Sequence, residues 1–235
     1  MVEFTCSLLE LDIVGEMLRA DVGQFPFDIP LHGGTIEERR RLAELAQRNL
    51  TERGLFDGND FDPEFAGLVL LFARGELSIA MLGTAGDRRY LARASTDGQS
   101  GVLATLEDQR VTLRPVPPTG MVRSLVSLLP PMKPGVGTAV SIPVGETEQP
   151  RHGQGDDDDR AIEAILARPR LGAGYFGVTA RDRDDRESEP LTLNWLDTDA
   201  GRYMIVSDGN ERVTYAPADQ SHIDQALSFH LRTVE

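Results

Sequence analysis

The short run Asp197-Thr-Asp199 contains the residues whose types and spacing best fit a catalytic or metal-binding site. Two carboxylates at i and i+2 of an extended chain point the same way and could chelate a divalent cation. Ala-Gly follows them, however, and such an Asp usually accepts hydrogen bonds from the backbone amides of a turn. We predict a structural turn here, flanked by Arg202 and Tyr203. A metal-dependent enzyme or ligand-binding protein that uses this corner is the alternative.

The run from Gly172 to Gly177 matches the G-x-G-x-x-G pattern of dinucleotide-binding loops. That pattern binds a pyrophosphate only when a strand precedes it and a helix follows, because the helix N-terminus must meet the phosphates. Here a helix is expected to end at Pro169, and a strand is expected to follow the run. We therefore expect these glycines to allow a close passage of the chain into a sheet.

The rest of the catalytic inventory is thin. The sequence contains no nucleophile elbow, no H-E-x-x-H and no P-loop. The histidines are scattered, and His222 and His230 stand too far apart on one helix to share a metal. We predict that the protein is not an enzyme, with no catalytic residue, no metal and no cofactor.

Composition limits the classes of binding partner and the cellular compartment that we expect. The 235 residues carry a formal net charge of -14, which disfavours nucleic acid and anionic membranes as partners. Cys6 is the single cysteine, so no disulfide can form within the chain. The N-terminal residues carry acids in place of the basic region of a signal peptide, and the longest apolar run is Leu68 to Ala73. We therefore expect a cytoplasmic protein without a membrane anchor.

The elements that must position any site fall into two series. Capping boxes at Ser7–Glu10 and Thr35–Glu38, and Asp62-Pro63, predict three early helices. The expected buried residues are Leu9, Ile13, Met17, Val14 and Leu18 in the first helix, Leu42, Leu45, Ala46 and Leu50 in the second, and Phe65, Leu68, Val69 and Phe72 in the third. Strands are expected at 77–82, 89–94, 102–106 and 110–114, followed by a helix at 117–129.

The second series begins after a polar stretch at 145–159, which we expect to be a linker or loop. Its acids Asp156 to Asp159 fit the N-terminus of a helix that ends at Pro169. Strands are then expected at 175–181, 191–196, 202–206 and 212–215. A last helix from Pro217 buries Ile223, Ala226, Leu227 and Leu231.

The two series resemble one another at a constant offset of 102 residues. Residues 110–129 align with 212–231 without a gap and share six identities in twenty, against roughly one expected by chance. The same offset lays 102–104 on 204–206 and 89–94 on 191–196. A shared Pro and Ser/Thr pattern at strand-to-helix junctions is the competing explanation. The repeat predicts an α+β fold with a central antiparallel sheet, a quasi-twofold internal repeat and flanking helical bundles. The halves would be about 1–145 and 156–235, joined by the acidic linker 146–155.

Several stretches together make the sequence recognisable. RPRLGAGYFGVTARDRDDR, LNWLDTDAGRYMI and RVTYAPAD occur in this order, and LLELDIVGEML, GGTIEERRRLAEL and VTLRPVPP precede them. The chain resembles, over nearly its whole length, the EspG family of ESX (type VII) secretion-associated proteins of actinobacteria. The resemblance implies a cytosolic chaperone that binds PE–PPE heterodimers at the helical tip of the PPE protein and keeps them soluble for export. In that family a long loop between two early strands helps to grip the partner, whereas Gly83 to Arg88 forms only a tight turn here. The partner would be a PE–PPE-like or a WXG100-like secreted protein.

The last helix carries the candidate partner-binding residues, His222, Gln225 and Phe229. Phe229 lies off the apolar stripe of Ile223, Leu227 and Leu231, so it is either exposed, or bridges to the 156–168 helix, or completes the core. Trp195 is expected in the core. A homo-oligomeric structural or interaction module is the remaining alternative to a chaperone.

Overall fold

The structure is a computed structural model that describes residues 2–143, 154–182, 184, 186–207 and 212–234. The chain forms two compact units. The first comprises Met1–Ala80, Leu91–Leu125 and Thr179–Ser188, and the second comprises Met81–Tyr90, Val126–Val178 and Glu189–Glu235. The predicted halves at about 1–145 and 156–235 stay a prediction.

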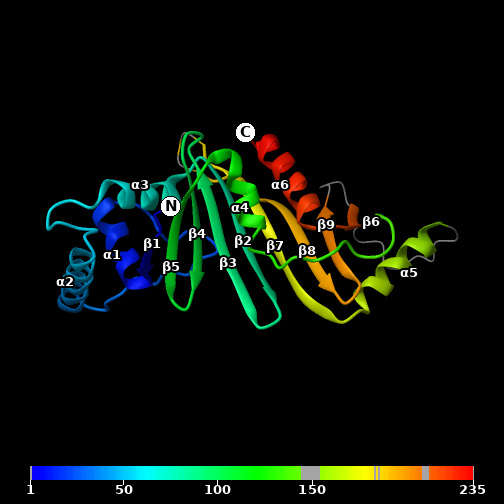
Figure 1. The fold of residues 1–235 in the computed structure, drawn as a ribbon, viewed down its shortest axis with the longest axis horizontal. Coiled ribbons are helices and arrows are strands. Elements are labelled where there is room, and N and C mark those ends of the chain that lie inside the picture. Colours follow the sequence, from blue (N-terminus) through cyan, green and yellow to red (C-terminus); the bar gives the residue numbers. More distant parts are fainter. Residues whose placement is uncertain (1, 144–153, 183, 185, 208–211, 235) are drawn as a thin grey trace. The chain divides into compact units, whose positions relative to one another are not determined.

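The described residues form a ten-stranded sheet built of antiparallel strand pairs (Figure 1). The strand order is β1-β5-β4-β3-β2-β7-β8-β9-β10-β6. The strands are β1 (Phe4–Ser7), β2 (Leu77–Ala85), β3 (Arg88–Thr96), β4 (Gly101–Glu107), β5 (Arg110–Val116), β6 (Val140–Pro143), β7 (Arg170–Ala180), β8 (Leu191–Thr198), β9 (Gly201–Ser207) and β10 (Arg212–Pro217). This order contains two four-stranded meanders, β5-β4-β3-β2 and β7-β8-β9-β10. Each meander has one short strand, β1 or β6, at its outer edge. The predicted α+β class with an antiparallel sheet is confirmed.

Register within each meander refines the predicted repeat. Leu113 of β5 and Tyr215 of β10 correspond at the predicted offset. Leu113 lies opposite Ala104, however, whereas Tyr215 lies opposite Ile205 rather than Val206. The predicted offset is therefore wrong by one residue for β9. It is wrong by the same amount for β8, because Arg93 lies opposite Ala104 whereas Asn194 lies opposite Ile205. The chain is correspondingly one residue longer between the paired residues Ser207 and Val213 than between the equivalent pair Leu106 and Val111.

Six α-helices are found among the described residues: α1 (Leu8–Leu18), α2 (Ile36–Glu52), α3 (Pro63–Arg74), α4 (Met121–Val126), α5 (Gln154–Leu166) and α6 (Gln220–Val234). The capping box of α1 is complete, because Ser7 and Glu10 each accept a hydrogen bond from the other's backbone N–H. The predicted box of α2 is half formed. Thr35 accepts from the amide of Glu38, but the Glu38 carboxylate accepts from the amide of Gly34 instead.

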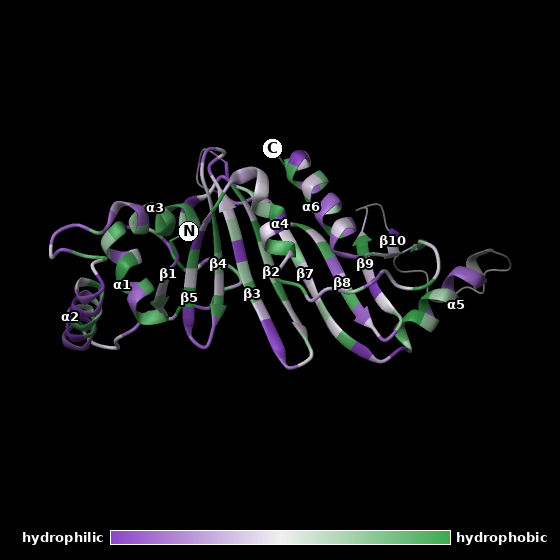
Figure 2. Cartoon of the chain, in the orientation of Figure 1, coloured by the Kyte–Doolittle hydropathy of each residue, from purple (hydrophilic) through white to green (hydrophobic). Residues whose placement is uncertain are grey.

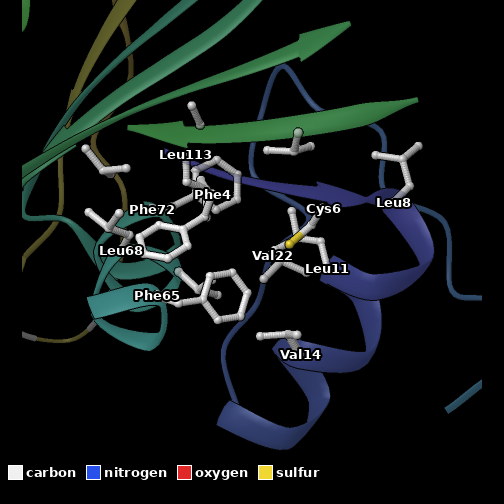
Figure 3. Close-up of a cluster of buried hydrophobic side chains, with 14 of the residues drawn as sticks. Phe4, Cys6, Leu8, Leu11, Val14, Val22, Phe65, Leu68, Phe72 and Leu113 are labelled. Atoms are coloured by element: carbon white, nitrogen blue, oxygen red, sulfur yellow. The ribbon is translucent and has the colours of Figure 1, made fainter. Parts of the chain in front are cut away.

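The hydrophobic core of the first unit lies between its helices and the β1–β5–β4 part of the sheet (Figure 3). Phe65 and Phe72 of α3 are fully buried in it, as predicted, and Phe4 of β1 packs on Phe65 with 5.6 Å between ring centroids. The predicted stripe of α1 is partly wrong: Ile13 and Val14 are buried as predicted, but Leu8 and Leu11 are buried as well and Met17 is exposed. Leu45 of α2 is also exposed, against prediction, although Ala46 and Leu50 are buried. The side of α2 away from the core is strongly hydrophilic (Figure 2).

The edge strand β1 was not predicted. Its four residues are too few to show a two-residue period, and β6 escaped prediction for the same reason. The backbone carbonyl of Thr5 in β1 accepts a hydrogen bond of 2.6 Å from Arg53, which follows α2. Arg53 also pairs at 2.9 Å with the buried carboxylate of Glu10. Arg53 therefore holds the end of α2 on the outer strand.

Helix α5 begins at Gln154, two residues before the predicted N-terminal acids, so the predicted linker 146–155 is too long by residues 154 and 155. Asp157 to Asp159 lie in its first turns, as predicted. Acids are favourable there because the N-terminus of a helix carries partial positive charge. Ile165 of this helix packs with Leu196 and Tyr203 in a second cluster. Residues 144–153, which include most of the predicted acidic linker, lie outside the described part. None of the described helices has the length and apolar character needed to span a membrane.

Candidate functional site

Helix α6 presents the three predicted partner-binding residues on one exposed face. His222, Gln225 and Phe229 follow each other at three- and four-residue spacing, which places them on one side of a helix. All three are exposed, and the exposed fraction of Phe229 is 61%. Ile223 and Leu227 on the opposite side are fully buried, as predicted. Phe229 therefore does not complete the core, and its exposure is one of the three outcomes that the sequence left open.

The N-terminus of α6 is held firmly in place. Asp219 accepts hydrogen bonds from the amides of Ser221 and His222, at 2.9 and 3.1 Å, and its Oδ1 lies 2.7 Å from Nδ1 of the His222 ring. The hydroxyl of Ser221 and the His222 ring hold the pKa of Asp219 well below its usual range. Gln220 donates to the carbonyl of Leu129 at 2.7 Å, so the start of α6 is tied to the turn after α4.

The ring of His230 lies beside Phe229 at the edge of this face. The two ring centroids are 6.3 Å apart. His230 is half-buried, and burial lowers the pKa of its imidazole because the charged form loses hydration. The exposed face of α6 therefore combines one large apolar side chain with polar neighbours around it.

The Asp197–Asp199 corner is built around a buried ion pair. Both oxygens of Asp197 accept from Arg202, at 2.6 Å from Nε and 2.8 Å from Nη2, and both side chains are buried. Asp199 is exposed and pairs with Arg168 at 3.2 Å. The two carboxylates do not converge, and the described residues contain no cluster of three His, Cys, Asp or Glu suited to a metal. The alternative of a cation at this corner is therefore not supported by its geometry.

The turn itself is built differently from the prediction. Thr198, rather than Asp197, bonds the local backbone: its hydroxyl accepts from the amide of Ala200 and donates to the carbonyl of Gly201. Asp197 is instead drawn to Arg202, because these residues face each other across the β8–β9 hairpin. The buried guanidinium also lies 5.6 Å from the centroid of the Trp195 ring, which is in the core as predicted.

Arg202 and Tyr203 fasten the segment after α4 to strand β9. Arg202 donates to the carbonyl of Pro130 at 3.0 Å, and the Tyr203 hydroxyl donates to the carbonyl of Val136 at 3.0 Å. A Cβ added to Gly135 would lie 2.2 Å from the Tyr203 ring, so a glycine is required there. The predicted structural role of Arg202 and Tyr203 is consistent with these contacts.

The glycine run at 172–177 lies in strand β7, which excludes the strand-then-helix context of a dinucleotide loop. A Cβ added to Gly174 would lie 2.4 Å from the carbonyl oxygen of Leu82, and one added to Gly172 would lie 2.7 Å from that of Thr84. These glycines therefore allow the close backbone passage that the sequence predicted. The β2–β3 connection is also the predicted tight turn, with only Gly86 and Asp87 between the strands.

Comparison with known proteins finds a matching family and a similar fold. A sequence model of the EspG family matches residues 7–228. The fold is similar to that of the Mycobacterium tuberculosis type VII secretion system chaperone EspG5, whose structure was solved in complex with a PE25–PPE41 dimer. The two chains share 14% sequence identity with a TM-score of 0.70, and the match covers 97% of this chain and 95% of that chain. None of the curated proteins compared with the chain matches it.

Proposed function

Because the chain belongs to the EspG family, we propose that it is a type VII secretion chaperone for a PE–PPE-like heterodimer. It binds the helical tip of the PPE-like subunit, keeps the dimer soluble in the cytoplasm and delivers it for export. The observation that carries this proposal is the full-length fold match to a chaperone whose structure holds a PE–PPE dimer. No bond is made or broken in this function, so no catalytic residue and no cofactor is needed.

The exposed face of α6 is the proposed contact surface. A helical tip that aggregates alone must bury apolar side chains, so its chaperone needs an exposed apolar group within a polar surround. Phe229, exposed by 61%, supplies the apolar group, and His222 and Gln225 supply hydrogen-bonding groups on the same face. Aromatic side chains gain the most free energy per residue when they are buried at such interfaces.

Rigidity of the helix supports the same role. The Asp219 cap and the bond from Gln220 to Leu129 fix the start of α6 before any partner binds. Because little conformational entropy remains to be lost on binding, a small polar-rimmed surface can still hold its partner. The small interface also permits release, which a chaperone that stays behind at export requires.

Co-expression with a PE–PPE-like pair tests the proposal. The pair is expected to stay soluble and to elute with the wild-type chain, and to precipitate when expressed alone. Phe229→Asp is expected to weaken the complex at least tenfold, because it places a charge in the apolar centre. Ile36→Asp is the matched control, since Ile36 is another exposed large apolar residue, in α2. Unchanged affinity in the Phe229→Asp variant would remove this face from the interface.

Self-association is the remaining alternative for the same face. Light scattering of the purified chain, with and without the PE–PPE-like pair, distinguishes the two. A stable homodimer that Phe229→Asp dissociates, with no complex formed with the pair, would favour the homo-oligomeric module over the chaperone.

A further inference from the structure

The His222 ring at the start of α6 forms a dyad with Asp219. Nδ1 of the ring lies 2.7 Å from Oδ1 of Asp219. The same oxygen accepts from the hydroxyl of Ser221 at 2.7 Å and from the amides of Ser221 and His222 at 2.9 and 3.1 Å. These bonds hold the pKa of the Asp219 carboxyl well below its usual range, so the acid is ionised at neutral pH. Asp219 can therefore accept hydrogen bonds but has no proton to donate.

The ionised carboxylate fixes which ring nitrogen of His222 carries the proton. In a neutral imidazole one nitrogen donates and the other accepts, so Nδ1 must be the donor toward Asp219. The amide of Asp219 also lies 3.4 Å from Nδ1. That contact is longer than the one to the carboxylate and involves no charge, so the carboxylate decides the tautomer. The lone pair of the neutral ring is therefore on Nε2.

Nε2 of His222 is open to another molecule. The side chain is 51% exposed, and among the residues that the structure describes the ring bonds only to Asp219. The carboxylate of Asp219 is 35% exposed, and within the same part of the chain no Arg or Lys pairs with it. The dyad thus presents an acceptor with an uncompensated negative charge directly behind it.

This charge selects the class of donor that the ring attracts. A carboxylate that accepts from one imidazole nitrogen makes the other nitrogen a better acceptor. Hydrogen bonds from a cation to such an acceptor are stronger than those from a neutral hydroxyl or amide. Complementary charges across an interface also add to its specificity. A Lys or Arg side chain therefore fits Nε2 best.

We infer that the Asp219–His222 dyad recognises a Lys or Arg side chain of the PE–PPE-like partner, which donates to Nε2 of the ring. The inference rests on the proposed function and names the chemistry of the partner at that face. Phe229 lies seven residues further along α6, a rise of about 10 Å. The partner is thus expected to carry its cation at that distance from the apolar group that buries Phe229.

Two substitutions of His222 test the acceptor. Gln has a side-chain carbonyl that can accept in place of Nε2, so His222→Gln is expected to keep affinity for the co-purified pair within about threefold. His222→Lys places a cation there, and affinity is expected to fall at least about tenfold because like charges repel across an interface. Titration calorimetry at pH 8 measures both. Gln99→Lys is the matched control, since it adds the same charge at an exposed turn of the first unit and is expected to leave affinity unchanged.

Asp219→Asn tests the charge behind the ring. Asn caps a helix about as well as Asp, so the start of α6 is expected to stay in place and the melting temperature to change little. Affinity should fall, and its dependence on salt concentration should weaken, because one charge of the interface is lost. A salt dependence equal to that of the wild-type chain would assign a neutral donor to Nε2 and overturn the inference.

NMR spectra of the free chain at pH 8 test the dyad without a partner. Long-range proton–nitrogen correlations of the His222 ring are expected to show a protonated Nδ1 and a bare Nε2. A proton on Nε2 would overturn the inference and leave the proposed function intact. Wild-type affinity in His222→Lys, with Phe229→Asp still weakening the complex, would do the same. A wild-type chain that binds no PE–PPE-like pair would overturn both.

Discussion

The guanidinium of Arg93 in strand β3 lies 2.6 Å from a carboxylate oxygen of Glu187, in the connection between β7 and β8. The Arg93 side chain is only 3% exposed, and it also donates to Ser78 at 3.0 Å. Burial lowers the pKa of Arg93, and the Glu187 carboxylate opposes that change. Arg181 pairs with the same carboxylate oxygen at 2.9 Å. One carboxylate oxygen thus bridges two arginines, and Glu187 ties the β7–β8 connection to strand β3.

Glu187→Gln is expected to lower the free energy of unfolding by about 1–3 kcal/mol, because it leaves the buried Arg93 charge without its counterion. The lower end of that range allows for the partial exposure of Glu187. Urea unfolding followed by circular dichroism measures it. Arg160→Gln removes an exposed pair with Asp157 and should change stability by less than about 0.5 kcal/mol. Equal effects of the two changes would contradict the assignment.

Asp197→Asn is expected to destabilise the second unit by about 3 kcal/mol, since it breaks a fully buried ion pair with Arg202. Asp199→Asn should have little effect, because Asp199 is exposed. Thermal unfolding of the two variants gives the comparison. Stoichiometric divalent cation in the purified wild-type chain, lost in either variant, would instead revive the cation site.

Gly135→Ala is expected to lower stability by about 1–3 kcal/mol through overpacking, because its Cβ would overlap the Tyr203 ring. The hydroxyl bond of Tyr203 to Val136 restrains the ring from moving aside. Gly177→Ala serves as the control, since its Cβ would come no nearer than 3.5 Å to Pro190. Differential scanning calorimetry measures both, and a Gly135→Ala melting temperature at or above the control's would be inconsistent with the described packing.

The Cys6 thiol is expected to be unreactive in the folded chain. It is fully buried, and burial raises its pKa to about 12, so almost no thiolate forms near pH 8. A thiol-reactive disulfide reagent at pH 8 should label the protein in guanidinium chloride and leave the native protein unlabelled. Rapid labelling of one equivalent under native conditions would show that the β1 region opens readily.

Much of the fold could be predicted because its strands alternate and its helices carry caps. The eight strands of the two meanders and the buried face of α3 follow from local periods alone. The short strands β1 and β6 could not be found this way, since their place depends on pairing with distant residues. Leu45 and Met17 were misassigned because apolar spacing does not reveal which helix face another element covers.

Fewer features of the candidate site than of the fold could be predicted from the sequence. The Asp197–Arg202 pair had a usable signal, because a two-residue turn at Asp199-Ala200 sets these residues opposite each other. The helical period of Ile223 and Leu227 placed Phe229 off the buried stripe but did not decide between exposure, a contact with another helix and completion of the core.

The hydrogen bond from Arg53 to Thr5 protects an exposed edge of the sheet. An outer strand with bare peptide groups is a template on which other chains can stack into fibrils. Arg53 occupies a peptide oxygen of that strand and sets a charged side chain beside it. The contact lies within the folded chain itself, so it protects this sheet edge from pairing with other chains without help from any partner.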